Sequence, residues 1–282
     1  EMTSSLVGSE MCIRDSTNIL LFSKNKNQHK TLCAVTNKQN KDSVRNLSVF
    51  VQQEGMVCDF ASYEPWVILT PIEQSIKRKI EVVGTPLKDW DIQIYRGVLT
   101  GCNDAFIIST EKRNEILANC QSEDERQRTE ELIRPILRGR DIKRYGYNWA
   151  NLWLINIHNG IKGKLPRIDI NEYPAIKVHL DQYWNKIKDR MDQGDTPYNL
   201  RNCAYMEDFF KPKITWGNLN LKGTYSYVQK GMFINAPSPF IVTSNIAILH
   251  ILNSKIADYY IRSLGVTRNG AVSYTHLRAH ET

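Results

Sequence analysis

The chain has 282 residues, enough for one large domain or two small ones, and its apolar fraction of 41% is ordinary for a globular protein. No apolar run reaches the roughly 18–20 residues of a membrane-spanning helix, and we see no secretory signal peptide. Lysine and arginine outnumber the acids by 37 to 30, which favours a polyanionic partner.

The two ends differ in texture from the rest of the chain. SSLVGSEMCIRDS near the start and VSYTHLRAHET at the end resemble translated sequencing-adapter read-through, so we interpret residues 1–16 and 272–282 as artefacts. They carry net charges of −2 and 0, so the remainder has a formal charge of +9 rather than +7. Leaving them out also removes His276 and His280, whose i, i+4 spacing resembles a zinc site. Because the first residue is Glu, we expect a fragment.

The five cysteines outside these ends are scattered and contain no CxxC pair. An odd number without close spacing predicts neither a disulfide framework nor a metal site. This usage is typical of a reducing compartment, and we expect the protein in the cytoplasm.

Short apolar runs at 17–22, 32–35 and 47–52 predict a small antiparallel set of strands, and the lysines of 24–45 fit solvated hairpin tips. The sequence Thr70-Pro71-Ile72-Glu73 predicts a helix start with a capping box, and Gly84 predicts its end. Ile72, Ile76 and Ile80 would form one apolar stripe on that helix.

From residue 91 onward, predicted strands and helices follow one another closely. Residues 91–109 predict a strand, a tight turn and a strand, followed by helices at 111–120 and from the capping residues Ser122 and Glu125 to about 133. Further strands are predicted at 151–157, 211–216, 224–234 and 239–243. A helix opened by Pro174 carries a core stripe of Ile176, Leu180, Tyr183, Trp184 and Ile187, and a helical pair at 246–264 is split near Asn253.

The most basic segment is residues 133–145, IRPILRGRDIKRY. Its cations are Arg134, Arg138, Arg140, Lys143 and Arg144, against one acid, Asp141. Pro135 stops the preceding helix, Gly139 allows a close approach, and Ile133, Ile136, Leu137 and Ile142 should anchor the segment. Planar guanidinium groups on a fixed turn suit a phosphate backbone. A surface loop whose arginines pair with the acids of 123–131 is an equal alternative.

Several motifs beyond residue 91 resemble a known family. GVLTGCNDAFIIS, IRPILRGRDIKRY, WLINIHNG, PAIKVHLDQYWNKIKDRMDQGDTPYNLR, FFKPKITWGNL and LHILNSKIADYY occur in this order. Over residues 97–265 they resemble the TaqI-like C-terminal specificity domain of adenine-specific DNA methyltransferases, including type IIG restriction-modification enzymes. The run TNILLF resembles the last strands of the preceding methyltransferase domain.

The resemblance implies an α+β fold, a target recognition domain of mixed and antiparallel strands with packed helices. The implied order is an artefact at 1–16, methyltransferase strands at 17–52, a helical connector at 53–96, the specificity domain at 97–271 and an artefact at 272–282. It also implies that the whole protein binds S-adenosylmethionine and methylates the exocyclic amine of adenine, with or without an endonuclease activity. The domain here would choose the DNA sequence, and the partner it lacks is the methyltransferase domain of the same chain.

We expect no catalysis and no bound cofactor or metal from the fragment itself. A Gly-rich cofactor loop is missing, as is the Asn/Asp-Pro-Pro-Tyr/Phe motif that holds a flipped adenine. Residues 235–240, NAPSPF, are superficially similar, but they lack adjacent prolines and lie on the wrong side of the specificity domain.

The predicted partner is duplex DNA, whose phosphates position a protein and whose base edges specify a sequence. We predict positioning by Arg138, Arg140, Lys143 and Arg144, with Tyr145 packing beside them and Asp141 paired to an arginine. Arg recognises guanine, and Asn or Gln recognises adenine, so base readout is predicted from two polar stretches. Their candidates are Arg190, Gln193, Tyr198, Asn199 and Arg201, and then Lys211, Lys213, Trp216, Asn218 and Asn220. The structural alternative puts Trp216 in the core and lets Arg190 and Arg201 bridge Asp189, Asp192 or Asp195.

Three rival functions stay open. The first is a stand-alone specificity subunit of a type I restriction system, which the gene sequence upstream would distinguish. The second is an RNA-processing or RNA-modifying protein, which competition between duplex DNA and RNA would separate. The third is a purely structural domain, which would show no salt-sensitive affinity for nucleic acid.

Overall fold

The computed structural model describes residues 2–6, 19–23, 30–36, 42, 45–58, 60, 68–90, 92–220, 222–264, 267–268 and 271–273. The chain divides into two compact units. Unit 1 comprises Glu1–Pro86 and Arg262–Gly270, and unit 2 comprises Leu87–Ile261 and Ala271–Thr282.

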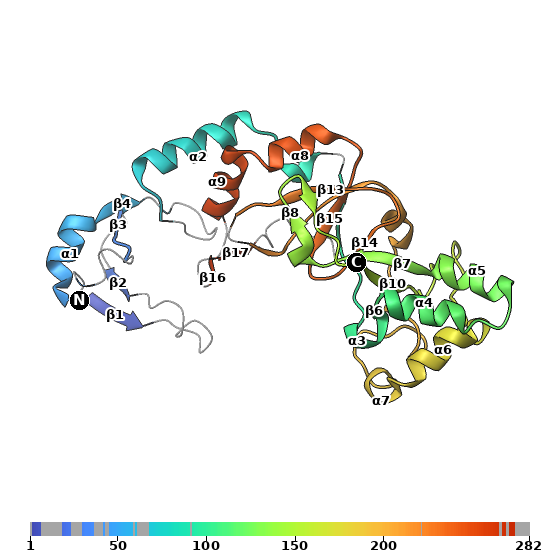
Figure 1. The fold of residues 1–282 in the computed structure, drawn as a ribbon. Coiled ribbons are helices and arrows are strands. Elements are labelled where there is room, and N and C mark those ends of the chain that lie inside the picture. Colours follow the sequence, from blue (N-terminus) through green and yellow to red (C-terminus); the bar gives the residue numbers. More distant parts are fainter. Residues whose placement is uncertain are drawn as a thin grey trace. The chain divides into compact units, whose positions relative to one another are not determined.

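The described part of unit 1 contains short strand pairs and the helices α1 (Leu47–Glu54) and α2 (Pro71–Val83) (Figure 1). β1 (Met2–Leu6) pairs antiparallel with β2 (Ile19–Ser23), and β3 (Thr31–Cys33) pairs antiparallel with β4 (Met56–Cys58). The strand β16 (Thr267–Arg268) completes the described elements. The strands predicted at 17–22 and 32–35 are therefore confirmed as β2 and β3.

The strand predicted at 47–52 is wrong, because this segment forms α1. Asn46 caps the helix: its Oδ1 accepts the N–H of Val49 at 3.3 Å, and its carbonyl accepts that of Phe50 at 2.9 Å. A strand buried on one face would have every second side chain buried. In this segment Phe50 is the buried residue, so the burial pattern is not that of a strand. Of the lysines predicted in the hairpin tips, Lys30 is exposed, and Lys24, Lys26, Lys38 and Lys41 lie outside the described residues.

The predicted capping box opens α2. The hydroxyl of Thr70 accepts the N–H of Glu73 at 3.3 Å, and the carboxylate of Glu73 accepts the N–H of Thr70 at 2.8 Å. Gly84 ends the helix, as predicted. Ile72 and Ile76 are exposed, so the predicted apolar stripe is not buried among the described residues.

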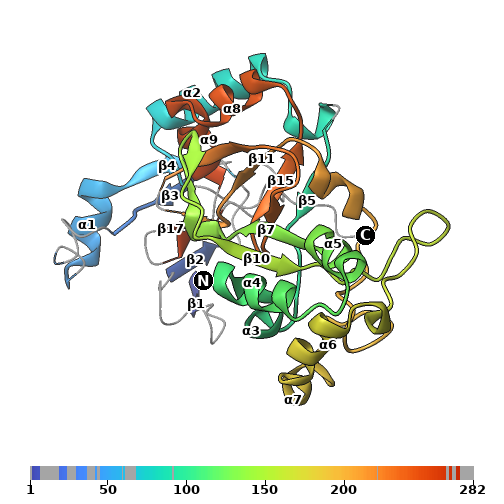
Figure 2. The ribbon, with the colours of Figure 1, turned by 45° about the vertical axis from the view of Figure 1, so that its right-hand side comes forward.

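Unit 2 contains two four-stranded sheets. The first has the order β14-β7-β10-β6 and consists of β6 (Ile107–Ser109), β7 (Ile133–Leu137), β10 (Leu152–Ile155) and β14 (Phe233–Ile234). β14 runs parallel to β7, and the other pairs are antiparallel. Figure 2 shows α4 (Thr110–Ala118) and α5 (Glu123–Leu132) beside β10 and β7.

Three further helices pack with this sheet: α3 (Asn103–Phe106), α6 (Pro174–Asp181) and α7 (Trp184–Ile187). Ile176, Leu180 and Ile187 are fully buried in its core, which confirms most of the predicted stripe. Trp184 instead stays 40% exposed. The helix predicted as continuous is interrupted at Gln182 and Tyr183, between α6 and α7.

The second sheet has the order β13-β11-β15-β5 and is antiparallel throughout. Its strands are β5 (Ile94–Arg96), β11 (Lys213–Trp216), β13 (Tyr225–Val228) and β15 (Pro239–Val242). On one face Ile214, Trp216 and Ile241 pack against α8 (Ile246–Leu252), whereas Phe240 and Val228 join the core of the first sheet. Both faces of this sheet are therefore covered, because successive residues of a strand point to opposite faces.

The remaining elements are short. β8 (Ile142–Lys143) pairs with β9 (Gly146–Tyr147), and β12 (Leu219–Asn220) pairs with β17 (Ala271–Ser273). α9 (Lys255–Leu264) follows α8. Single 3-10 turns occur at Leu87–Asp89, Gly139–Asp141, Ile170–Glu172 and Met206–Phe210.

The predicted α+β class is confirmed, and most predicted elements after residue 110 are present. One connection differs, because β5 and β6 do not form a hairpin: they belong to different sheets, with α3 between them. None of the helices in the described parts of the chain has the length and apolarity needed to cross a bilayer.

Candidate nucleic-acid interface

The basic segment begins as the buried strand β7 and ends in a tight turn. Ile136, Leu137 and Ile142 are buried, which confirms the predicted anchoring. Gly139 approaches its own chain, because an added Cβ there would lie 2.8 Å from the Ser238 Oγ and 3.7 Å from the Gly217 Cα. The cations of this segment are therefore carried on a fixed backbone.

Arg138 and Asp141 form a clamp across the turn. Asp141 accepts hydrogen bonds from the Nε of Arg138 at 3.0 Å, from its Nη2 at 2.8 Å and from its backbone N–H at 3.0 Å. Burial alone would raise the pKa of Asp141, but these hydrogen bonds outweigh it and hold the pKa below its usual range. They also raise the pKa of Arg138. The predicted pairing of Asp141 with an arginine is confirmed.

The β8–β9 hairpin continues the turn and docks on residues far away in the sequence. Tyr145 adopts a left-handed backbone (φ 65°), and its N–H donates to the Tyr225 carbonyl at 2.9 Å. Its ring lies 5.4 Å from that of His250 and 5.1 Å from the Arg144 guanidinium. Arg144 donates from Nη2 to the Asn253 carbonyl at 2.7 Å. Tyr145 thus packs beside an arginine as predicted, whereas the sequence contained no signal for His250 or Asn253 in this role.

We call residues 138–145 the basic turn. Arg140, Lys143 and Arg144 are exposed on it. Lys143 donates to the Arg140 carbonyl at 2.8 Å, and within the described chain the Arg140 guanidinium has no ion pair or hydrogen bond. Arg134 differs, because it is half-buried in β7 with its guanidinium 5.1 Å from the Phe210 ring. Burial lowers the pKa of Arg134.

The alternative, in which the arginines of 133–145 pair with the acids of 123–131, does not hold for the basic turn. Arg134 in β7 does interact electrostatically with Glu131. Three acids of α5 pair with arginines outside the basic segment: Glu130 with Arg113 at 2.6 Å, Glu123 with Arg126 at 3.7 Å, and Asp124 with Arg128. The basic turn therefore keeps an exposed cationic surface whose internal carboxylate partner is Asp141.

Two of the candidates in the 190–201 loop are internal. The buried Arg190 donates to the carbonyls of Ile187, Pro197 and Asn199, and its guanidinium lies 4.6 Å from the Phe106 ring. Burial lowers the pKa of Arg190 to about 10. Asn199 is buried as well, and its Nδ2 donates to the Ile168 carbonyl at 2.9 Å. Both side chains tie the loop together, so burial removes them from direct base readout.

The other candidates of this loop reach the surface. Tyr198 donates to Asp181 at 2.6 Å and lies 5.5 Å from the Trp184 ring. Arg201 pairs with Asp192 at 3.2 Å, one of the predicted bridges. Gln193 is half-buried. These residues belong to a region beside α6 and α7, separate from the basic turn.

Lys213 and Trp216 are buried in β11, so neither can contact a duplex in this fold. The Lys213 amine donates to the carbonyls of Phe209 at 2.7 Å and Met232 at 3.1 Å, and burial lowers its pKa to about 8. The structural alternative for Trp216, a core position, is correct. Lys211 is exposed and pairs with Asp208 at 2.7 Å.

Asn218 is the candidate of this stretch that lies beside the basic turn. It is half-buried and follows Gly217, whose Cα faces Gly139. The side chain of Asn220 lies outside the described residues. The structure therefore brings Arg138, Arg140, Lys143, Arg144 and Tyr145 into one patch with Asn218 at its edge.

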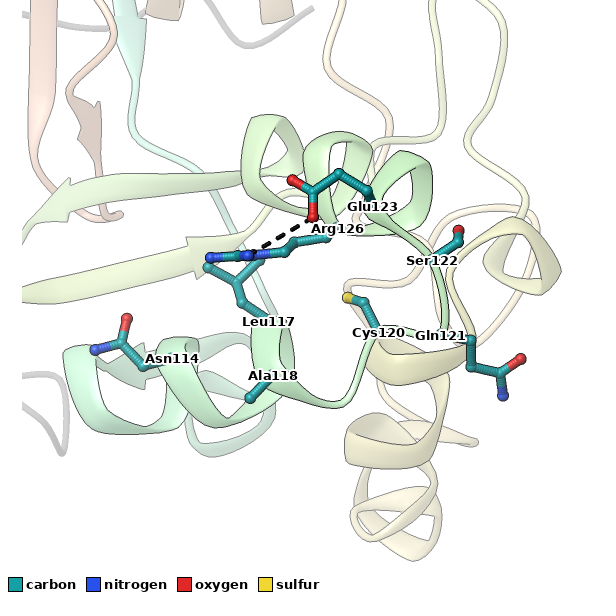
Figure 3. A pocket seen from close by; sticks show the side chains of 8 residues that line it. All are labelled: Asn114, Leu117, Ala118, Cys120, Gln121, Ser122, Glu123 and Arg126. Atoms are coloured by element: carbon teal, nitrogen blue, oxygen red, sulfur yellow. Dashed lines mark ion pairs between the residues drawn. The ribbon is translucent and has the colours of Figure 1, made fainter.

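A pocket of about 470 Å³ opens between α4 and α5 (Figure 3). Its lining includes Asn114, Cys120, Gln121 and the ion pair between Arg126 and Glu123, and it contains none of the predicted site residues. Among the described residues, no group of three His, Cys, Asp or Glu side chains is placed to hold a metal ion.

Comparisons with known proteins identify the class to which this fold belongs. The fold is similar to that of the type IIL restriction-modification enzyme MmeI, solved in complex with DNA, with a TM-score of 0.50 and 13% sequence identity. The similarity covers 66% of this chain and 24% of that enzyme. A family model, the TaqI-like C-terminal specificity domain, matches residues 134–278, and the chain belongs to this family. No curated protein matches the sequence.

Proposed function

We propose that this chain recognises a specific sequence of duplex DNA on behalf of a larger adenine-specific DNA methyltransferase of the type IIG restriction-modification class. The observation that carries the proposal is the basic turn, whose exposed cations stand on a rigid element of a TaqI-like specificity domain. A larger parent protein fits the small share of the similar enzyme that this chain covers. Its expected place of action is the cytoplasm.

Within this proposal the residues of the basic turn have different tasks. Arg140, Lys143 and Arg144 contact phosphates, which fixes the register of the protein on the duplex. Arg138 holds the turn through Asp141, so it positions the other cations. Asn218, at the edge of the patch, is the best-placed side chain for reading a base edge, since its amide can pair with adenine.

S-adenosylmethionine would bind to another part of the parent protein, because Gly97 and Gly101, which lie before α3, do not fit it. A cofactor cradle needs glycines that leave open space for the ligand. An added Cβ on Gly97 would meet the main chain of Ile234 and Asn235 at 2.5 and 2.6 Å, and one on Gly101 would meet the Arg190 side chain at 2.9 Å.

The test is the salt dependence of duplex binding by the full chain. Fluorescence anisotropy with a labelled duplex, between roughly 50 and 200 mM salt, measures the log–log slope of affinity against salt. We expect R140A/K143A to weaken binding to unrelated sequences alike and to reduce the slope by about 0.9 for each phosphate that the variant no longer neutralises.

The matched control is K112A/K186A, which removes two lysines that pair with Glu115 and Asp104. We expect the slope of this control to stay close to that of the unchanged chain. A chain without salt-dependent affinity for duplex DNA, or an R140A/K143A variant equal to the control, would contradict the proposal. Reading the gene upstream separates the methyltransferase assignment from a stand-alone specificity subunit.

A further inference from the structure

A second basic element follows β10. Ile161 and Leu165 exchange hydrogen bonds of 2.8 and 2.9 Å, which close a small hairpin over residues 160–167. Its tip is Gly163, which has φ 77° and no atom within 4 Å of an added Cβ. Figure 2 shows this yellow-green loop after β10 projecting away from the sheets. We call residues 160–167 the basic hairpin.

The base of the basic hairpin is fixed. Gly160 has φ 77°, and an added Cβ would lie 2.5 Å from the Leu165 oxygen and 2.7 Å from the Arg167 nitrogen. Its N–H donates to the Nδ1 of His158 at 3.2 Å. Ile161 and Leu165 pack against the core of unit 2. The tip is therefore presented by a rigid support.

The charges of the basic hairpin are almost unopposed. Lys162 and Lys164 flank the tip and are exposed, and within the described chain neither side chain has an ion pair or a hydrogen bond. Arg167 faces Asp195 at 3.7 Å. Asp195 also accepts a hydrogen bond from Asn159 at 2.9 Å, so it is shared between two partners.

An open groove of about 860 Å³ runs between the basic hairpin and Asn202, Cys203 and Ala204. Lys162, Lys164 and Arg167 line it, with Asp195 as its carboxylate. The described lining contains no aromatic side chain on which a base could stack. Its chemistry suits a phosphate backbone rather than base edges.

The two basic elements lie at opposite ends of one strand pair. Ile133 at the start of β7 faces Ile155 at the end of β10, and the basic hairpin follows Ile155 after four more residues. The basic turn follows Leu137 at the other end of β7. The four residue steps along β7 span about 13 Å at about 3.3 Å per residue. The two basic elements therefore leave this strand pair at opposite ends.

We propose that the basic hairpin is a second, sequence-independent contact with the phosphate backbone of duplex DNA. This inference rests on the proposed function, since it presumes that the chain binds a duplex. Lysines on a short rigid hairpin act as point charges that neutralise phosphates without reading bases. The hairpin and the basic turn would hold the duplex at two separate places, which restricts its rotation on the protein.

The experiment compares K162A/K164A with the unchanged full chain, with K112A/K186A as the control for the removal of two positive charges. We expect K162A/K164A to weaken binding to unrelated duplexes equally and to reduce the log–log salt slope by about 0.9 for each phosphate left without its lysine, up to about 1.8. K164E should weaken binding further, because it places a negative charge against the backbone. Both positions are exposed, so the thermal midpoint should not change.

The outcomes are separable from those of the proposed function. If the unchanged chain binds DNA and R140A/K143A weakens binding, but K162A/K164A equals the control, the hairpin proposal is overturned alone. If the unchanged chain has no salt-sensitive affinity for duplex DNA, the proposed function fails first. Tighter binding of duplex RNA that K162A/K164A abolishes, with DNA binding unaffected, would overturn the assignment to DNA.

Discussion

The Arg144 guanidinium donates a hydrogen bond of 2.7 Å to the main-chain oxygen of Asn253, and so ties the basic turn to the end of α8. The Asn253 side chain exchanges two hydrogen bonds with the main chain of Tyr225, at 3.1 and 2.9 Å. The main-chain oxygen of Tyr225 also accepts a hydrogen bond from the N–H of Tyr145. Asn253 therefore connects α8, β13 and the basic turn.

We expect N253A to lower the free energy of unfolding by about 1–3 kcal/mol, because it removes two buried hydrogen bonds between the Asn253 side chain and the main chain of Tyr225. Urea denaturation followed by circular dichroism measures this change. The control is N148A, at an exposed asparagine of the same unit, for which we expect a change within about 0.5 kcal/mol. Equal effects of the two variants would contradict the role of Asn253.

We expect D141N to lower the free energy of unfolding by about 1.5–3 kcal/mol at pH 7, since a buried carboxylate loses its charge-assisted bonds to Arg138. The folded-state pKa of Asp141 lies below its unfolded value, so its contribution is present above about pH 4 and is lost as pH falls through the folded pKa. Unfolding measured from pH 7 down to pH 3 should show a weaker acid dependence in D141N. D104N, which disrupts an exposed pair with Lys186, is the control and should have little effect.

Variants of Arg190 distinguish a residue that stabilises the fold from one that contacts DNA. We expect R190A to destabilise the protein by roughly 3 kcal/mol, because one carbonyl at the end of α7 and two loop carbonyls lose a charged donor. R190K should not restore stability, since an ammonium cannot reproduce the planar fork. R201A, at the exposed partner of Asp192, should change stability by less than about 0.5 kcal/mol. A stable R190A that reduces the salt slope of DNA binding would return Arg190 to the interface.

Because of Lys213, the free energy of unfolding should depend on pH in the alkaline range. Burial lowers its folded-state pKa from the ordinary 10.5 to about 8, so the unfolded chain binds more protons between these values. Stability should therefore rise with pH in this window, by at most about 1.4 kcal/mol per pH unit. K213M removes the titrating amine, and the difference between the two unfolding curves from pH 8 to 9.5 isolates it. Parallel curves would show that Lys213 keeps an ordinary pKa.

Local signals in the sequence predicted much of the fold. The Thr70 and Glu73 capping box gave the start of α2, and the periodic apolar residues from Ile176 gave α6. Ser122 and Glu125 predicted the start of α5, but the contact differs: the Glu125 carboxylate accepts from Gln121 and from Ala175 rather than from Ser122. Local patterns report backbone preference, and distant partners complete or redirect the side chains.

The basic segment at residues 133–145 could be predicted because its composition is local: five cations, one acid and apolar anchors lie within thirteen residues. The sequence could not predict which polar residues lie at the surface and which lie in the interior. The sequence predicted three polar residues as exposed DNA contacts that are in fact buried: Lys213, Arg190 and Asn199. Each of these side chains donates hydrogen bonds to main-chain carbonyls of other segments. Their burial depends on which elements cover each face of a sheet.

By itself the sequence determined the α+β class, the family pattern after residue 91 and the existence of a cationic turn anchored by Ile136 and Leu137. Only the tertiary structure decided that Arg140, Lys143 and Arg144 stay exposed while Lys213 and Arg190 are internal. The physical reason is that charge and periodicity are properties of a segment. Burial and hydrogen bonding instead depend on contacts such as Arg144 with Asn253, which the chain makes across 109 residues.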